Sequence, residues 1–192
     1  MTRKRKPKTY DSVTEMVRVI SDDPSFVKEF EEQLADVRDE TPTISFTVPG
    51  PPLSQPRQRH RIALGGSGKA YVQNYIPTHA PVNTYKAAVQ MACSAQIGSM
   101  LDGPLSLVAL FVMPRPASKT RKTKPNPSYP HVGIPDLDNL EKALLDAMQG
   151  VAFANDSQVA CKFTRKIVAA GGEMPRTEVT LGPIEPPPEP AT

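Results

Sequence analysis

The chain has 192 residues and a formal net charge of +3, and 39% of its residues are hydrophobic. This length predicts one domain with appendages, and so small a positive charge excludes nucleic-acid binding through the overall field alone. The 2 cysteines and 3 histidines show no zinc-ligand spacing. Without a secretory signal or an apolar run of bilayer length, we expect a soluble, intracellular protein with no membrane partner.

The first forty residues form a predicted extension that is separate from the main domain at 41–184. Residues 1–8 are strongly basic, and residues 12–37 are predicted to contain two helices, the second with an apolar stripe and an acidic remainder. One interpretation is an extra helix packed on the domain. The other is that this helix covers a DNA-binding face or binds a protein partner. Residues 185–192, rich in proline and glutamate, are predicted to be a disordered tail.

Hydrophobic periodicity in the main domain is typical of an α/β (α+β) fold. The expected elements are strands at 43–48, 105–113, 158–168 and 177–181 and helices at 82–97 and 139–149, with a turn through Gly171 and Gly172 joining the last two strands. We expect a single mixed β-sheet with the helices packed on one face. Cys93 in the first helix and Cys161 in the third strand are predicted to be small buried residues in a reducing compartment.

The segment Pro135–Lys142, with the sequence PDLDNLEK, gathers carboxylates where a core could not use them. Asp136 and Asp138 lie on one side of an extended chain, where a divalent cation could bridge them. Magnesium prefers carboxylate, water and phosphate oxygens, so such a site suits phosphodiester chemistry. In another interpretation, Asp138 caps the following helix and Glu141 completes a capping box. Asp136 is not explained by capping.

Asp156 and Lys142 can complete this site. The helix at 139–149 would be about 16 Å long at about 1.5 Å per residue, and residues 151–156 can span roughly 20 Å when extended. Chain geometry therefore allows Asp156 to lie beside Asp136 and Asp138. Lys142 falls on the same helix face as Asp138, either as its ion-pair partner or as a cation directed at a phosphate in the transition state.

Two basic clusters precede the acidic segment, one after the first strand and one in a proline-rich loop that also holds Arg115. Such a cluster is often only a solvated or disordered loop. Beside a phosphate-cutting site, however, basic side chains offset the repulsion between carboxylates and DNA and fix the register on the duplex. The residues to which we assign DNA binding are Arg57, Arg59, Arg61, Lys119, Arg121, Lys122 and Lys124, with His60 in the first cluster.

These motifs together resemble those of the RusA-type Holliday junction resolvases. The resemblance rests on P-D-x-D-N-x-x-K at 135–142, on the Leu-Asp-Ala helix end at 145–147 and on Asp-Ser-Gln-Val at 156–159, and it covers residues 41–184. It implies that Asp136, Asp138 and Asp156 hold Mg²⁺, for which Mn²⁺ is a substitute, and that Lys142 is required for cutting. It also implies a homodimer that nicks two opposing strands of a four-way DNA junction. Many members are encoded by phages or prophages, so we expect a cytoplasmic, nucleoid-associated protein of a bacterial host.

The chain departs from the family pattern at two positions. Ile134 stands where a basic residue is frequent, and Asn155 stands where an acidic residue is frequent, so each changes the field around the site. Two other function classes stay open: a branched-DNA-binding protein that does not cut, and a metal-dependent phosphohydrolase of small substrates. Charge-to-alanine changes at 119–124 distinguish these classes, because they would weaken a junction enzyme and spare a small-substrate enzyme.

Overall fold

The computed structural model describes residues 43–56, 59–64, 66, 68–75, 80–121 and 125–184. For 59–61 and 73–75 it describes the backbone alone. Our predictions for the segments 1–40 and 185–192, and for Arg57, Lys122 and Lys124, lie outside the described residues. In the described part of the chain, no helix combines the length and the apolar character needed to cross a membrane.

A five-stranded mixed sheet forms the body of the protein, as predicted, with the strand order β1-β7-β4-β6-β5. The central β4 pairs with β6 in parallel and with β7 in antiparallel orientation, while β1 and β5 pair antiparallel at the two edges. We expected a hairpin of the last two strands, but β4 separates β6 from β7. The strand bounds are β1 (Ile44–Pro49), β4 (Leu105–Met113), β5 (Tyr129–Pro130), β6 (Val159–Val168) and β7 (Arg176–Pro183).

The sequence of β4 explains its place at the centre of the sheet. The run LSLVALFVM is buried at every position, and a continuous apolar run of this length is typical of a strand that is covered on both faces. Alternate residues of β4, among them Leu107, Ala109 and Phe111, belong to the main hydrophobic core.

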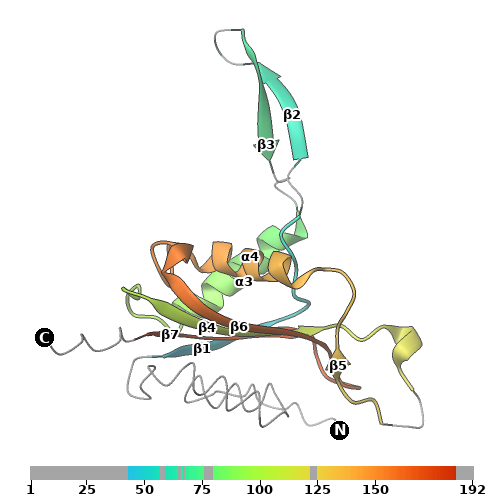
Figure 1. Cartoon of the computed structure of the whole chain (residues 1–192). Helices are drawn as coiled ribbons and strands as arrows, with labels where there is room; N and C mark the ends of the chain where they lie inside the picture. The colour runs from blue at the N-terminus through green and yellow to red at the C-terminus, as the bar shows by residue number, and fades with distance from the viewer. Residues whose placement is uncertain are drawn as a thin grey trace, which may run out of the picture.

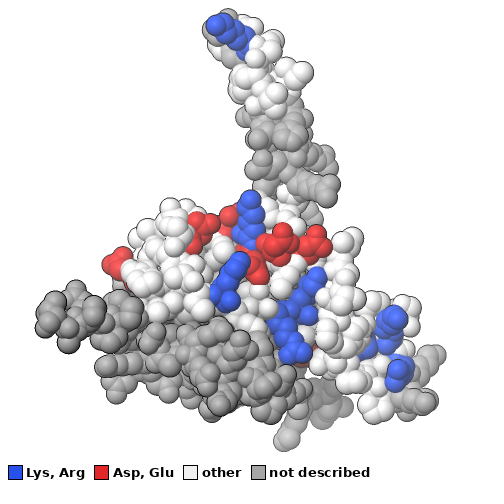
Figure 2. Space-filling view, viewed as in Figure 1, with Lys and Arg blue, Asp and Glu red and all other residues white. Residues whose placement is uncertain are grey.

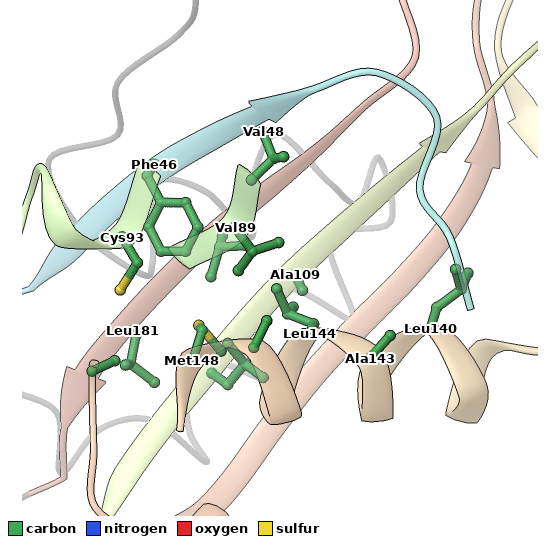
Figure 3. Packing of buried hydrophobic residues seen from close by; sticks show 14 of the residues in the cluster. Phe46, Val48, Val89, Cys93, Ala109, Leu140, Ala143, Leu144, Met148 and Leu181 are labelled. Atoms are coloured by element: carbon green, nitrogen blue, oxygen red, sulfur yellow. The ribbon is translucent and has the colours of Figure 1, made fainter. Parts of the chain in front are cut away.

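Two helices, α3 (Pro81–Ser94) and α4 (Leu137–Met148), lie on the same face of this sheet (Figure 1). Figure 3 shows Leu144 and Met148 of α4 and Val89 of α3 directed into the core beside residues of the sheet. Tyr85 of α3 is buried and hydrogen-bonds the hydroxyl of Thr177 in β7 at 2.9 Å. Burial raises the pKa of Tyr85 to about 12, and this hydrogen bond opposes part of the shift.

The crossover from β4 through α4 to β6 decides where the acidic motifs lie. Because β4 and β6 are parallel, the helix between them must run back along the sheet. The N-terminal end of α4 therefore lies at the end of the sheet where β4 and β6 finish, and β6 begins at the opposite end (Figure 1).

A second, two-stranded sheet stands off the body as a narrow ribbon (Figure 1). It consists of β2 (Arg59–Leu64) and β3 (Ala70–Tyr75), paired antiparallel with Ile62 opposite Val72. We did not predict this hairpin, and its basic residues were assigned to DNA binding alone. The signal was present in the sequence: two runs of mixed apolar and polar residues flank a glycine-rich segment at 65–68.

The two cysteines differ in burial. Cys93 of α3 is completely buried, as predicted, but Cys161 of β6 is only half-buried. Both thiols are free, and burial raises the pKa of each, to about 11 for Cys93.

Candidate active site

The start of α4 presents two exposed carboxylates. Asp136 occupies the N-cap position with an extended backbone (φ −70°, ψ 149°), yet its side chain makes no capping hydrogen bond. Asp138 lies in the first helical turn, where Oδ1 accepts a hydrogen bond from Nδ2 of Asn139 at 3.4 Å. The helix begins two residues before the predicted start, so the interpretation of Asp138 as its N-cap is wrong. Capping accounts for neither carboxylate.

Lys166 of β6 holds the chain that leads into Asp136. Its Nζ donates hydrogen bonds to the carbonyl oxygens of Gly133 at 2.8 Å and Pro135 at 2.5 Å. A hydrogen bond from a charged donor is stronger than one between neutral groups, so this contact restrains the approach to α4.

Glu141 anchors the first turns of α4 to the same strand. Glu141 is only 7% exposed, and its carboxylate accepts hydrogen bonds from Nζ of Lys162 and from the hydroxyl of Thr164. Lys162, Thr164 and Lys166 alternate along β6 and so share one face of the sheet. Sequence reasoning assigned Glu141 to a capping box and missed this role, although polar residues at the alternate positions 162, 164 and 166 of the strand were a visible signal.

Lys142 lies on the exposed surface of α4, one turn after Asp138. It forms no ion pair with any residue that the structure describes. The simple ion-pair interpretation of Lys142 and Asp138 is therefore not supported within the described chain, and the ammonium group is available to a phosphate.

A short 3₁₀ turn, η2 (Asp156–Gln158), presents Asp156. Asn155 caps this turn, and its Oδ1 accepts a hydrogen bond from the amide of Ser157 at 3.0 Å. Oε1 of Gln158 accepts hydrogen bonds from the amides of Ala154 and Asn155 at 2.9 and 3.1 Å. Nε2 of Gln158 donates to the carbonyls of Leu101 and Gly103, both at 3.2 Å. The turn is firmly held, and the side chain of Asp156 is exposed.

The single chain does not bring Asp156 to the other two aspartates. Asp156 lies just before β6, which begins at Val159. Asp136 lies next to Pro135, whose carbonyl is bound by Lys166, and Lys166 is seven residues after Val159 along the strand. At about 3.3 Å per residue these two ends of β6 are roughly 23 Å apart. No group of three or more His, Cys, Asp or Glu side chains that could hold a metal ion occurs among the described residues. The expected return of Asp156 to Asp136 and Asp138 is therefore not met within one chain.

Comparison with known proteins decides the family. The family model described as "Endodeoxyribonuclease RusA" matches residues 49–182. The chain belongs to the RusA endodeoxyribonuclease family. It is also similar to the "Uncharacterized protein YqaN" of Bacillus subtilis (strain 168), with 29% identity over 144 residues that cover 72% of this chain and 94% of the relative. The matched segment includes both acidic motifs and the basic loop.

The structure shows what surrounds the two residues, Ile134 and Asn155, at which the chain departs from the RusA pattern. Ile134 is 87% exposed, and Lys166 binds the carbonyls of the residues on either side of it. A positive charge therefore reaches this segment from the sheet instead of from position 134. Asn155 supplies the cap of η2.

The basic loop after β4 is ordered around Arg115. The guanidinium group donates hydrogen bonds to the carbonyls of Ala169 at 2.9 Å, Lys119 at 3.2 Å and Asn126 at 3.4 Å, and also to that of Pro127. It lies 5.1 Å from the centre of the Tyr129 ring, within cation–π distance. Arg115 therefore shapes the loop, a role that sequence reasoning missed.

Lys119 and Arg121 of this loop line a cavity of about 350 Å³, and none of the described residues that line it is acidic. Figure 2 shows basic side chains near the end of the molecule that carries η1 (Ala117–Lys119), and mixed acidic and basic side chains over α4 and β6. Of the first cluster, Arg59 and Arg61 lie in β2 of the ribbon. The predicted DNA-binding residues that are described thus occupy two separate parts of the molecule.

Proposed function

We propose that the chain is a structure-specific endodeoxyribonuclease that resolves four-way DNA junctions by metal-dependent paired nicking. The observation that carries this proposal is the pair of exposed carboxylates, Asp136 and Asp138, at the start of α4 inside the RusA family match. Neither forms an ion pair with a described residue. Two uncompensated carboxylates side by side are costly unless a cation joins them.

The remaining groups are assigned roles by position. Asp136 and Asp138 would hold Mg²⁺, or Mn²⁺ in its place, with Asp156 supplied as a third ligand by the other chain of a homodimer, and the ion would supply Lewis-acid activation of phosphodiester hydrolysis. Lys142 would contact the phosphate, and Lys166 and Glu141 would keep the α4 start in place. Lys119 and Arg121 would bind the DNA backbone, together with Arg57, Arg59, Arg61, Lys122 and Lys124. We infer that the working form is a homodimer acting in the bacterial cytoplasm on branched DNA.

The first experiment compares a labelled four-way junction with a linear duplex of the same sequence, in Mg²⁺ or in chelator, using the wild type and Asp138→Asn. We expect paired nicks on opposing strands of the junction only, lost with chelator and in the variant. Tight binding of the junction by the wild type without cuts would instead establish a branched-DNA-binding protein.

A further inference from the structure

The sheet has a second face, opposite the one on which α3 and α4 lie, and this face is buried as well. Val108, Leu110 and Val112 alternate along β4 with the residues that pack against the helices, so their side chains belong to the second face. Val108 and Val112 are 0% exposed, and Leu110 is 6% exposed. Thr180 and Glu178 of β7, which pair with Val108 and Leu110, are also buried. These side chains are shielded from water within a single chain, so the same chain must cover them.

The helices α3 and α4 cannot supply this cover, because they fill the first face. α3 contacts β1 and α4 contacts β6, on either side of the central β4. Two helices side by side are about 20 Å wide, and a five-stranded sheet spans about 19 Å between its edge strands. A further amphipathic helix of this chain can therefore bury its apolar side only against the second face.

Of the parts of the chain outside the described residues, the segment at 26–37 has the length and the pattern that this face requires. Phe26, Phe30, Leu34 and Val37 recur at helical spacing, and a helix over this range would be about 18 Å long at about 1.5 Å per residue. The internal gaps in the described chain are at most 4 residues long, and residues 185–192 are rich in proline and glutamate. Neither can cover an apolar sheet face.

The connection to β1 keeps this segment beside the sheet. Val37 precedes Ile44, the first residue of β1, by seven residues, so the two lie at most about 23 Å apart. β1 is an edge strand, and β4 lies two strand spacings, or about 10 Å, inside it. A helix that leads into β1 can therefore reach Val108.

The charges of the segment suit the second face. Arg165 of β6 pairs with Leu110, so its half-buried side chain lies on this face, and it forms no salt bridge with a described residue. Between Phe26 and Val37, four residues are acidic and one is basic. A helix with an acidic remainder lowers the cost of a guanidinium group that is partly withdrawn from water.

We propose that residues 26–37 form a helix that packs its apolar stripe on the second face of the sheet. The inference does not depend on the nuclease function. It chooses between the two interpretations of the N-terminal extension, because a helix on this face lies on the side of the sheet opposite α4. The extension then acts as a structural cover and leaves Asp136 and Asp138 open to DNA.

The deciding experiment labels a buried cysteine on the second face of the full-length chain. The reporter chain carries Val108→Cys, together with Cys161→Ser to remove the native thiol of this face. Cys93, which is completely buried on the first face, is the internal reference. Leu34→Asp places a carboxylate in the apolar stripe of the reporter chain. Gln33→Asp is the matched control, because it adds the same charge one residue outside the stripe.

Maleimide labelling is followed by mass spectrometry at several protein concentrations. Leu34→Asp should speed labelling at position 108 by at least about tenfold and leave labelling of Cys93 unchanged, because an unpaired carboxylate is strongly disfavoured in an apolar interface and opens it locally. Gln33→Asp should change neither rate. If Leu34→Asp prevents folding, Leu34→Ala and Gln33→Ala provide the same comparison.

Equal labelling at position 108 in the stripe variant and its control would overturn the proposal. Labelling of the reporter chain that accelerates on dilution would also overturn it, because the cover would then be a second copy of the chain. If Leu34→Asp bound a four-way junction more tightly than Gln33→Asp did, with unchanged labelling at position 108, the extension would be a mask over the DNA-binding face instead.

Discussion

At the scale of single residues, the acidic motif is held by side chains that do no chemistry themselves. Glu141 is buried against β6, where Lys162 and Thr164 satisfy its carboxylate. Removing one partner of a buried, hydrogen-bonded carboxylate lowers stability more than removing one partner of an exposed ion pair, because the remaining group is left buried and unsatisfied. The position of the helix turn that carries Asp138 and Lys142 therefore depends on the contact of Glu141 in α4 with β6.

We expect Glu141→Ala to lower the free energy of unfolding by about 1–3 kcal/mol, because Thr164 loses its partner and the α4 start loses its anchor. Lys162→Met should cost less than Glu141→Ala, because Thr164 still donates to the Glu141 carboxylate and the Lys162 side chain is 52% exposed, so its charge is partly screened by solvent. Urea denaturation of the two variants and of the double variant measures the coupling. Purely additive changes would contradict the pairing seen in the structure.

His131 is predicted to make the fold sensitive to acid. Its Nδ1 is buried with no hydrogen-bond partner among the described residues, and burial, followed by the charge of Lys166, lowers the pKa of its imidazole. The neutral form is therefore favoured in the folded state, so the unfolded chain binds more protons near its ordinary pKa of about 6.5. The contribution of His131 to stability is present above that value and is lost as the pH falls through it.

The test compares the wild type with His131→Gln at pH 7.5 and at pH 5.5 by urea denaturation. We expect the wild type to lose more stability between these two values than the variant does. Equal losses in the two proteins would show that other groups cause the acid sensitivity.

At the scale of elements, the β2–β3 ribbon and β4 differ most in the burial of their side chains. The ribbon leaves large apolar side chains in solvent, with Ile62 78%, Leu64 75% and Val72 67% exposed, whereas β4 is buried throughout. A two-stranded hairpin without a covered face is at best marginally stable in water. The ribbon is thus expected to open far more readily than the sheet.

Hydrogen exchange followed by mass spectrometry should show this difference directly. Amides of the ribbon should exchange by local opening, and amides of β4 only near the free energy of global unfolding. If the ribbon contacts DNA through Arg59 and Arg61, an added four-way junction should slow exchange in the ribbon while β4 stays unchanged. Ribbon amides as protected as those of β4 in the free protein would contradict the exposed arrangement.

At the scale of the whole molecule, a net charge of +3 is too small to attract DNA by itself, so local clusters must carry the binding. Lys119 and Arg121 lie together in a loop that Arg115 shapes, and the described residues that line the cavity beside them include no acidic side chain. The cluster therefore presents its positive charge without compensation from that lining.

Lys119→Ala with Arg121→Ala should weaken junction binding and reduce the slope of log K against log salt by up to about 1.8, since each phosphate contact contributes about 0.9. Hydrolysis of a small phosphodiester by the same variant should stay at the wild-type rate. Fluorescence anisotropy between low and moderate salt measures the slope. Unchanged junction affinity would show that this loop does not bind the backbone, and would favour a small-substrate enzyme.

The sequence alone determined the long strands and the two helices of the main domain, though not the β2–β3 ribbon, and most of the candidate chemistry. The apolar run at 105–113 predicted β4 to the residue, and helical spacing predicted α4 to within two residues, because these patterns reflect burial that is local in the chain. The acidic motif, the two basic clusters and the family resemblance were visible in the same way, since they depend on residue type and short spacing.

Only the tertiary structure decided which of these residues meet. The parallel pairing of β4 with β6 placed Asp136 and Asp156 at opposite ends of the crossover, although chain length alone allowed them to be neighbours. It also paired Glu141 with β6 instead of with the helix start, and placed β4 between the last two strands. Such contacts join residues far apart in sequence, and strand order and direction, which local patterns do not encode, determine them.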